Sequence, residues 1–264
     1  FIYLLGLFLN IFLPHVGIYH PMSSLTLFIA LNLSILAMLF ISPKQSNLKS
    51  PKIEIDITPV VVSLVLLPFL SIFGAYTATY HHSVNLILLF LFIISLAPLL
   101  VVSGKIPKKT YPLLIFTTSL SIMYHINLIS THLWSFDIFL ESYSTNIVLS
   151  SGIWDPKHYY KYHSLLLTTI LAPMYSLICN LSYVWVFKVI FPFLFSFTPL
   201  VLYKIYQNFE VGDYKIDETI AVLSVFIFVF FYGFFKKMPD KQYIAELFMS
   251  LVLLILATNL RNIK

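Results

Sequence analysis

Charged residues are scarce in this chain of 264 residues, where Asp, Glu, Lys and Arg together make up 10%, against about 25% in a typical soluble domain. Hydrophobic residues make up 59% of the chain and aromatic residues 17%. A soluble fold of this size has too little interior to hide so much apolar surface. The scarcity of charge therefore excludes a soluble globular protein and predicts a membrane protein.

Cysteine is almost missing as well, since Cys179 is the one residue of its type. A single cysteine excludes an internal disulfide framework and a zinc site made of cysteines. The sequence also has no glycine-rich phosphate loop, so we do not expect a nucleotide-sugar site. The net charge of +5 comes from lysines scattered in short loops, a pattern that does not indicate nucleic-acid binding.

Long apolar runs are what the chain does contain, and several reach the roughly twenty residues that cross a bilayer. Because a lipid-exposed backbone must satisfy its own hydrogen bonds, these runs predict helices. The sequence thus predicts an all-α fold, a polytopic transmembrane helical bundle in the cell membrane. The predicted spans are 1–13, 22–42, 59–80, 83–103, 111–130, 184–206, 218–235 and 244–260.

The spans predict three regions. These are N-terminal transmembrane helices over 1–130, an extracytoplasmic loop with juxtamembrane helices over 131–183, and further transmembrane helices over 184–264. The chain begins at Phe1 inside an apolar run and ends just after another, so we expect a fragment of a longer protein with a truncated first span.

Lysines predict the orientation of the spans. Three lysines each in the loops 43–58 and 104–110 mark these loops as cytoplasmic, which places the loop that begins at residue 131 outside. The run 164–181 is short and has Pro173 at its middle. This run either crosses the membrane or lies as a re-entrant or interfacial helix, and the lysines of the later loops do not decide between these topologies.

The outer loop gathers acids in the stretch FDIFLESYSTNIVLSSGIWDP, residues 136 to 156. The stretch predicts an amphipathic helix over 136–151 that ends at Gly152. Asp137 and Glu141 are spaced i, i+4 and share one face of this helix. Phenylalanine, leucine, tyrosine and isoleucine side chains give the other side an apolar surface. Such a helix is suited to the membrane interface.

Two interpretations of this stretch are open. An acid pair on one helix face is most often solvated, and the following GIWDPKHYYKYHS is typical of an interfacial aromatic belt with snorkelling lysines. Alternatively, the loop is catalytic, with one carboxylate as general base on an acceptor hydroxyl and a second that orients the acceptor or holds a divalent cation. No lysine at helical spacing offsets the like charges of the pair, which favours the catalytic interpretation. Asp155 precedes Pro156 and is typical of a turn.

Three stretches carry a resemblance to known proteins. FDIFLESYSTNIVLSSGIWDP, WVFKVIFPFLFSFTPLVLYKIY and KQYIAELFMSLVLLILA resemble a family of archaeal multi-pass membrane proteins of unknown function, which in turn is similar to the GT-C glycosyltransferases. The resemblance covers about residues 111–260. It implies a GT-C-like fold and a membrane enzyme that transfers a sugar from a polyprenyl-phosphate donor to a glycan, lipid or protein acceptor at the extracytoplasmic face.

The resemblance also implies the site. GT-C enzymes carry a catalytic acid in an outer loop soon after a transmembrane helix, a place that Asp137 takes here, with Glu141 as the assisting acid. Glu246 in YIAELF matches an acid of a later outer loop, and the resemblance favours a re-entrant 164–181. No metal-ligand spacing stands out, so a divalent cation is a candidate cofactor without assigned ligands. Further residues expected to bind the substrate are His158, Lys161 and His163.

Other functions compete with this enzyme. The chain is alternatively a transporter or flippase of lipid-linked glycans, or a non-catalytic membrane scaffold. Transporters often carry charges at the bilayer midplane and inverted repeats, and neither is evident here. Lys188 lies near one end of the span 184–206 and is expected to snorkel to the interface rather than to bind the donor phosphate. His81 and His82 are expected to form a turn between two spans.

Overall fold

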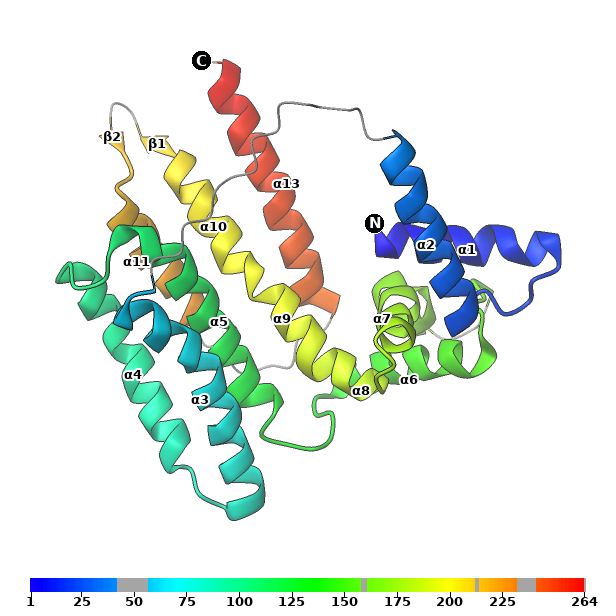
Figure 1. The fold of residues 1–264 in the computed structure, drawn as a ribbon, viewed down its shortest axis with the longest axis horizontal. Helices are drawn as coiled ribbons and strands as arrows, with labels where there is room; N and C mark the ends of the chain where they lie inside the picture. The colour runs from blue at the N-terminus through cyan, green and yellow to red at the C-terminus, as the bar shows by residue number, and fades with distance from the viewer. Residues whose placement is uncertain (42–56, 158–160, 212–213, 232–240, 264) are drawn as a thin grey trace. The chain divides into compact units, whose positions relative to one another are not determined.

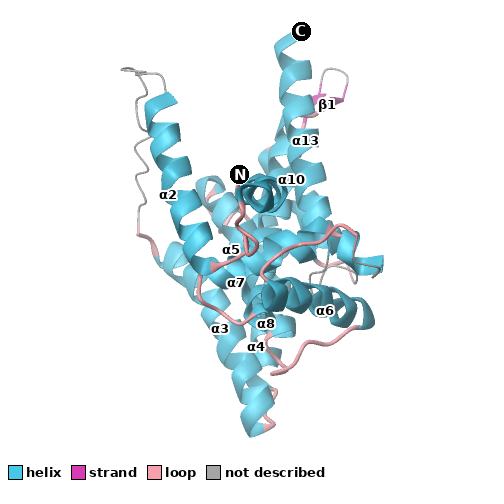
Figure 2. Ribbon diagram, turned by 90° about the vertical axis from the view of Figure 1, so that its right-hand side faces the viewer, coloured by secondary structure: helices cyan, strands magenta, loops and turns pink. Residues whose placement is uncertain are grey.

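The computed structural model of the protein describes residues 1–41, 57–157, 161–211, 214–231 and 241–263. Helices make up most of these residues (Figures 1 and 2). The β structure of the described part is one antiparallel hairpin of two-residue strands, β1 (Glu210–Val211) and β2 (Tyr214–Lys215). The prediction of a helical protein is therefore confirmed.

Four helical segments of the described chain are long and apolar enough to cross a membrane. They are α3 (Pro59–His81), α4 (Asn85–Val102), the segment Tyr183–Asn208 and, within α13 (Lys241–Ile263), Lys241–Asn259. Each coincides with one of the predicted spans. Their length and composition are those of membrane-crossing helices.

The remaining predicted spans form helices of 11 to 18 residues. These are α1 (Ile2–Phe12), α2 (Ser24–Ile41), α5 (Tyr111–Asn127) and α11 (Glu218–Val229). Hydroxyl side chains make α5 less apolar than its neighbours. They are buried, and those of Thr117, Ser119 and Ser121 donate to backbone carbonyls one turn earlier. That each of these helices crosses the membrane stays a prediction.

By its contacts the chain forms two compact units. Unit 1 comprises Phe1–Asp56 and Phe136–Val186, and unit 2 comprises Ile57–Ser135 and Phe187–Lys264. The three predicted regions followed expected membrane sides rather than contacts. The association of the first helices with the acidic loop is therefore a feature that the sequence did not reveal.

Unit 1 packs α1, α2 and η1 (Leu13–Val16) with the later elements α6 (Phe136–Ser151), η3 (Lys161–Ser164), η4 (Leu167–Leu171), α7 (Ala172–Ile178) and α8 (Tyr183–Trp185). Gly6 lets α1 approach η4 and α7 closely, since a Cβ at this position would lie 2.2 Å from Met174 Sδ and 2.6 Å from Ile170 Cγ2. The buried apolar centre of the unit is formed by Leu9, Met22, Leu27, Val148, Ile170 and Met174.

Two π-helical turns interrupt the apolar helices, and each ends two residues before a proline. The first turn is η4, followed by Pro173, and the second is η5 (Val186–Ile190), followed by Pro192. Proline has no N–H to donate and its ring crowds the carbonyl four residues earlier, so the preceding turn widens. The predicted span 184–206 is therefore not one regular helix but α8, η5, α9 (Phe191–Phe195) and α10 (Phe197–Asn208) in succession.

Unit 2 is built around α5. Helices α3, α9, α10 and α11 pack against α5, α4 packs beside α3, and α13 runs along α9 and α10 (Figure 1). The core includes Phe90, Leu114, Ile115, Phe195 and Val225, all nearly or fully buried. The short turn η2 (Lys108–Thr110) precedes α5.

One end of unit 2, which we name the lysine end, holds the start of α5. The Lys108 ammonium lies 2.9 Å from a carboxylate oxygen of Asp217, the residue that caps α11. Lys105 lines the same cavity as Pro59, the first residue of α3. The loop 103–110 and the starts of α3, α5 and α11 thus lie together.

The opposite end, which we name the Ser130 end, holds the other ends of these helices. Thr79 near the end of α3 donates a 2.5 Å hydrogen bond to the carbonyl oxygen of Ile129. The Lys188 ammonium donates to the carbonyl oxygen of Ser130. His81 ends α3, and His82 follows in the left-handed conformation with φ 52°, which gives the expected turn.

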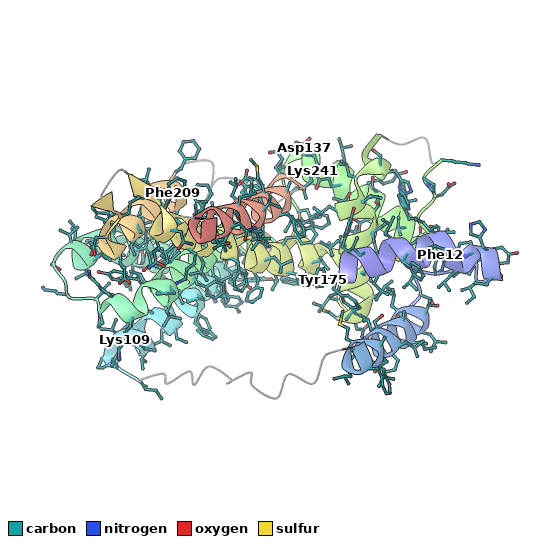
Figure 3. All side chains as sticks on the ribbon, turned by 90° about the horizontal axis from the view of Figure 1, so that it is seen from above. Phe12, Lys109, Asp137, Tyr175, Phe209 and Lys241 are labelled. Atoms are coloured by element: carbon teal, nitrogen blue, oxygen red, sulfur yellow. The ribbon has the colours of Figure 1, made fainter. Side chains whose placement is uncertain are left out.

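Helix α13 begins in the half of unit 2 nearer the Ser130 end. The Tyr243 ring packs edge-on against Phe195 at a centroid distance of 4.5 Å. Figure 3 shows Lys109 and Phe209 at one end of this unit and Lys241 toward the other. Helix α13 therefore runs in the same direction as α10.

Candidate functional site

The predicted bounds of the acidic helix are confirmed. Helix α6 spans Phe136–Ser151, and Gly152 follows with φ 70°, a backbone conformation that glycine adopts at low cost. The Asp155 carboxylate accepts a 2.9 Å hydrogen bond from the Lys157 N–H, so the predicted turn at Asp155 is also present. Local sequence chemistry thus defines the end of α6 and the turn that follows it.

The orientation of α6 is the reverse of the solvated acid face expected from the sequence. Glu141 is fully buried, as are Ser144 and Val148 on the same face. On the other side, Phe139 and Tyr143 are 54% and 56% exposed. The expectation of a solvated acid pair is wrong for Glu141, because this face packs on η4 and α7.

A backbone carbonyl of η4 explains why polar side chains face it. The Ala172 N–H bonds the carbonyl of Leu167, and Pro173 has no N–H, so the Thr168 carbonyl lacks a helical donor. The Thr145 hydroxyl of α6 donates a 2.7 Å hydrogen bond to this oxygen. Buried carbonyls require hydrogen-bond partners. Because Pro173 cannot donate to the Thr168 carbonyl, the Thr145 hydroxyl of α6 supplies the donor.

The two acids of α6 occupy different environments. Asp137 lies in the first turn and is partly exposed, where the helix dipole favours a negative charge. Glu141 lies one turn later on the buried face, beside Thr145. The helix therefore presents one solvated and one buried carboxyl at a spacing of four residues.

The basic residues predicted to contact phosphate are distributed unevenly. His163 belongs to unit 1 and is 2% exposed, and its carbonyl accepts a 3.0 Å hydrogen bond from the Trp154 ring N–H. Lys161 lies in η3, with its side chain outside the described atoms. His158 lies outside the described residues. The structure thus places His163 and the backbone of Lys161 in the same unit as Asp137 and Glu141.

Residues of the first 22 positions hold the end of α6, a role that sequence reasoning missed. The Asn10 side chain accepts a 2.8 Å hydrogen bond from the Trp154 N–H and donates one of 2.9 Å to the Gly6 carbonyl. The Met22 N–H donates to Gly152, and the His20 ring donates to Ser151. The one available signal was Asn10 itself, a polar residue inside an apolar run.

Glu246 belongs to unit 2, where it is exposed on the second turn of α13. This turn lies in the half nearer the Ser130 end, as the packing of Tyr243 on Phe195 indicates. Its convergence with Asp137 and Glu141 on one site stays a prediction, because these acids belong to unit 1.

Lys188 does not snorkel as expected. Its side chain is 1% exposed, and its ammonium donates to the carbonyl oxygen of Ser130. This oxygen follows the end of α5 and is a partner 58 residues away in the chain. The Ser130 carbonyl takes the place of the interfacial water that solvates the ammonium of a snorkelling lysine.

Metal binding has no preformed candidate in the described chain. Over residues 1–41, 57–157, 161–211, 214–231 and 241–263, no group of three or more His, Cys, Asp or Glu side chains is arranged to hold a metal ion. A divalent cation therefore stays a candidate cofactor without assigned ligands.

Comparison of the chain with known protein families, with curated proteins and with solved structures gave no match.

Proposed function

We propose that this protein is a multi-pass membrane glycosyltransferase of GT-C type that transfers a sugar from a polyprenyl-phosphate donor to an acceptor at the extracytoplasmic face of the cell membrane. The observation that carries the proposal is the pair of carboxyls on α6, with Asp137 partly exposed and Glu141 buried. Two carboxyls in contrasting environments are the usual arrangement of an acid–base site.

The points at which the chain leaves and re-enters unit 2 support a location of the proposed site at one membrane surface. Ser130 after α5 and Lys188 in the next span are joined by a hydrogen bond, so the chain leaves and returns to unit 2 at one end. Between them, η4 and α7 form a helix of 5 and 7 residues, about 18 Å at 1.5 Å per residue. A bilayer core of about 30 Å is longer, which favours a re-entrant segment.

In the proposed reaction Asp137 is the general base. Its carboxylate takes the proton of the acceptor hydroxyl as the acceptor oxygen bonds to the sugar carbon. The bond from that carbon to the donor phosphate breaks, and the phosphate leaves with the electron pair. Glu141 assists from the buried side of the same helix, while Lys161, His158, His163 and Glu246 are the proposed substrate-binding residues.

The test uses the full-length protein in proteoliposomes with labelled polyprenyl-phosphate sugars and membrane acceptors. Asp137→Asn keeps the size of the side chain and removes the base, so we expect transfer to fall by about 10²–10⁴-fold. Asp155→Asn is the matched control, since Asp155 is an exposed acid whose role is a turn. Transfer by Asp137→Asn at the wild-type rate would refute the catalytic assignment.

A flippase of lipid-linked glycans is the second candidate, favoured by the burial of Lys188 within the segment Tyr183–Asn208. An ionisable residue inside a membrane span is by default a functional candidate. Scrambling of a labelled lipid-linked sugar without transfer, abolished by Lys188→Met and not by Asp137→Asn, would select this function over the transferase.

A further inference from the structure

A cavity of about 390 Å³ lies within unit 2 between α4, α5 and the end of α11. Ile94 and Pro98 of α4, Ile122 of α5 and Phe230 form apolar walls, and His125 is the ionisable residue that lines it. The volume falls within the range of small-ligand pockets. His125 lies five residues before Ser130, so the cavity is nearer the Ser130 end.

The His125 side chain is 8% exposed, and its hydrogen bonding fixes which ring nitrogen is an acceptor. Nδ1 lies 2.7 Å from the carbonyl oxygen of Ile122. Because a carbonyl oxygen only accepts, Nδ1 carries the hydrogen, and Nε2 of the neutral ring presents a lone pair. Within the described part of the chain the His125 ring makes no second hydrogen bond.

The other polar groups around the cavity are acceptors too. Ser95 gives its hydroxyl hydrogen to the Phe92 carbonyl at 2.7 Å, which leaves the lone pairs of its oxygen. Pro98 has no N–H, so the Ile94 carbonyl four residues earlier lacks its usual helical donor. No Lys, Arg, Asp or Glu is among the described residues that line the cavity.

A cavity whose described lining is apolar, with several acceptors and no free donor, is complementary to a hydrocarbon ligand that brings its own donor. We infer that this cavity binds a neutral lipid alcohol, whose hydroxyl donates to Nε2 of His125 while its chain packs between Ile94, Ile122 and Phe230. A phosphorylated lipid is disfavoured, because no cation is among the described residues that line the cavity to pair with it. This site is independent of the proposed sugar transfer.

The binding experiment uses the full chain in liposomes and a clickable, diazirine-bearing geranylgeraniol as the probe. We expect light-induced cross-links on peptides of α4 and α5. Unlabelled geranylgeraniol should compete about tenfold better than its methyl ether, which has no hydroxyl hydrogen and so loses one hydrogen bond. Competition by the methyl ether or by geranylgeranyl phosphate at the level of the alcohol would overturn the inference.

Variants and a second alcohol complete the test. His125→Phe keeps a ring and removes the acceptor, and should abolish the preference for the alcohol over the ether; His81→Phe, outside the cavity, should retain it. Ser95→Ala removes the hydroxyl oxygen that is the alternative acceptor for the same ligand hydrogen. At an exposed position it is a milder variant that should weaken the preference even if His125→Phe does not fold. Full preference in both variants would overturn the site. Stronger competition by diacylglycerol identifies a glyceride ligand, and stronger competition by geranylgeraniol identifies an isoprenoid ligand.

Discussion

The ammonium of Lys108 lies 2.9 Å from a carboxylate oxygen of Asp217 and joins the loop before α5 to the N-terminal cap of α11. The two residues are 109 positions apart, so the pair places the ends of two distant helices at one end of unit 2. The hydrogen bond from Lys188 to Ser130 does the same at the opposite end. Together these contacts give α5 and the segment Tyr183–Asn208 opposite directions.

This arrangement makes a labelling prediction. If the chain between Ser130 and Lys188 does not cross the membrane, Cys179 faces the side opposite to the lysine end. Cys179 is exposed and is the single cysteine, so wild-type protein should react with a membrane-impermeant maleimide from the outside of intact cells. A thiol introduced by Ser103→Cys in a Cys179→Ser background should react only after permeabilisation.

One labelling result would contradict this topology. Reaction of both thiols from the same side would show that the run 164–181 crosses the membrane and would remove the proposed outer site. Cys179→Ser without an added cysteine is the control for non-specific labelling.

The ion pair predicts a pH dependence of stability. Hydrogen bonds from Lys108 first, and then from Thr219, lower the pKa of Asp217 to about 2. A lowered carboxyl pKa stabilises the fold above the ordinary value of 3.8, and this stabilisation is lost as pH falls through about 2. The difference in melting temperature between wild type and Asp217→Asn, which keeps the helix cap, should therefore shrink as the solution is acidified.

At basic pH the stability contributed by the ion pair changes in the opposite direction. The hydrogen bond with Asp217 raises the pKa of Lys108, so its contribution is complete below the ordinary value of 10.5 and is lost as pH rises through the higher value of the folded protein. Both side chains are about half exposed, so salt should reduce the difference. A difference in melting temperature between wild type and Asp217→Asn that stays constant from acid to basic pH would contradict the ion pair between Lys108 and Asp217.

The bounds of α6 could be predicted from the sequence, whereas its orientation could not. Gly152 and Asp155 act through local backbone chemistry, which a sequence displays directly. The buried face depends on η4 and α7, which lie elsewhere in the chain. Val148 was the available signal, an apolar residue on the face of Glu141, and its full burial shows which side packs.

Lys188 shows the same limit of prediction from the sequence. A lysine near a span end snorkels when water is its nearest partner, but the fold supplies the Ser130 carbonyl instead. That partner follows from the approach of α5 to η5, and no pattern near Lys188 encodes this approach.

The Thr145 hydroxyl should contribute to stability through the Thr168 carbonyl. Thr145→Val keeps the shape of the side chain and leaves this buried carbonyl without its donor, which should lower the free energy of unfolding by about 1–3 kcal/mol. Thr145→Ser keeps the hydroxyl and is the matched control. Denaturant titration of the full chain in detergent measures both, and equal losses for Val and Ser would show that methyl packing rather than the hydrogen bond matters.

Gly6 should be intolerant of any side chain because α1 packs closely on η4 and α7. The methyl group of Gly6→Ala would meet Met174 Sδ at 2.2 Å and Ile170 Cγ2 at 2.6 Å, and overpacking of this kind typically costs about 1–3 kcal/mol. Met174→Ala alone opens a cavity, but it also makes room for the new methyl. The double variant should therefore be more stable than the sum of the single losses predicts, whereas Leu4→Ala, at an exposed position of the same helix, should show no such coupling to Met174→Ala. Strict additivity of Gly6→Ala and Met174→Ala, measured as free energies of unfolding, would refute this packing of α1 on α7.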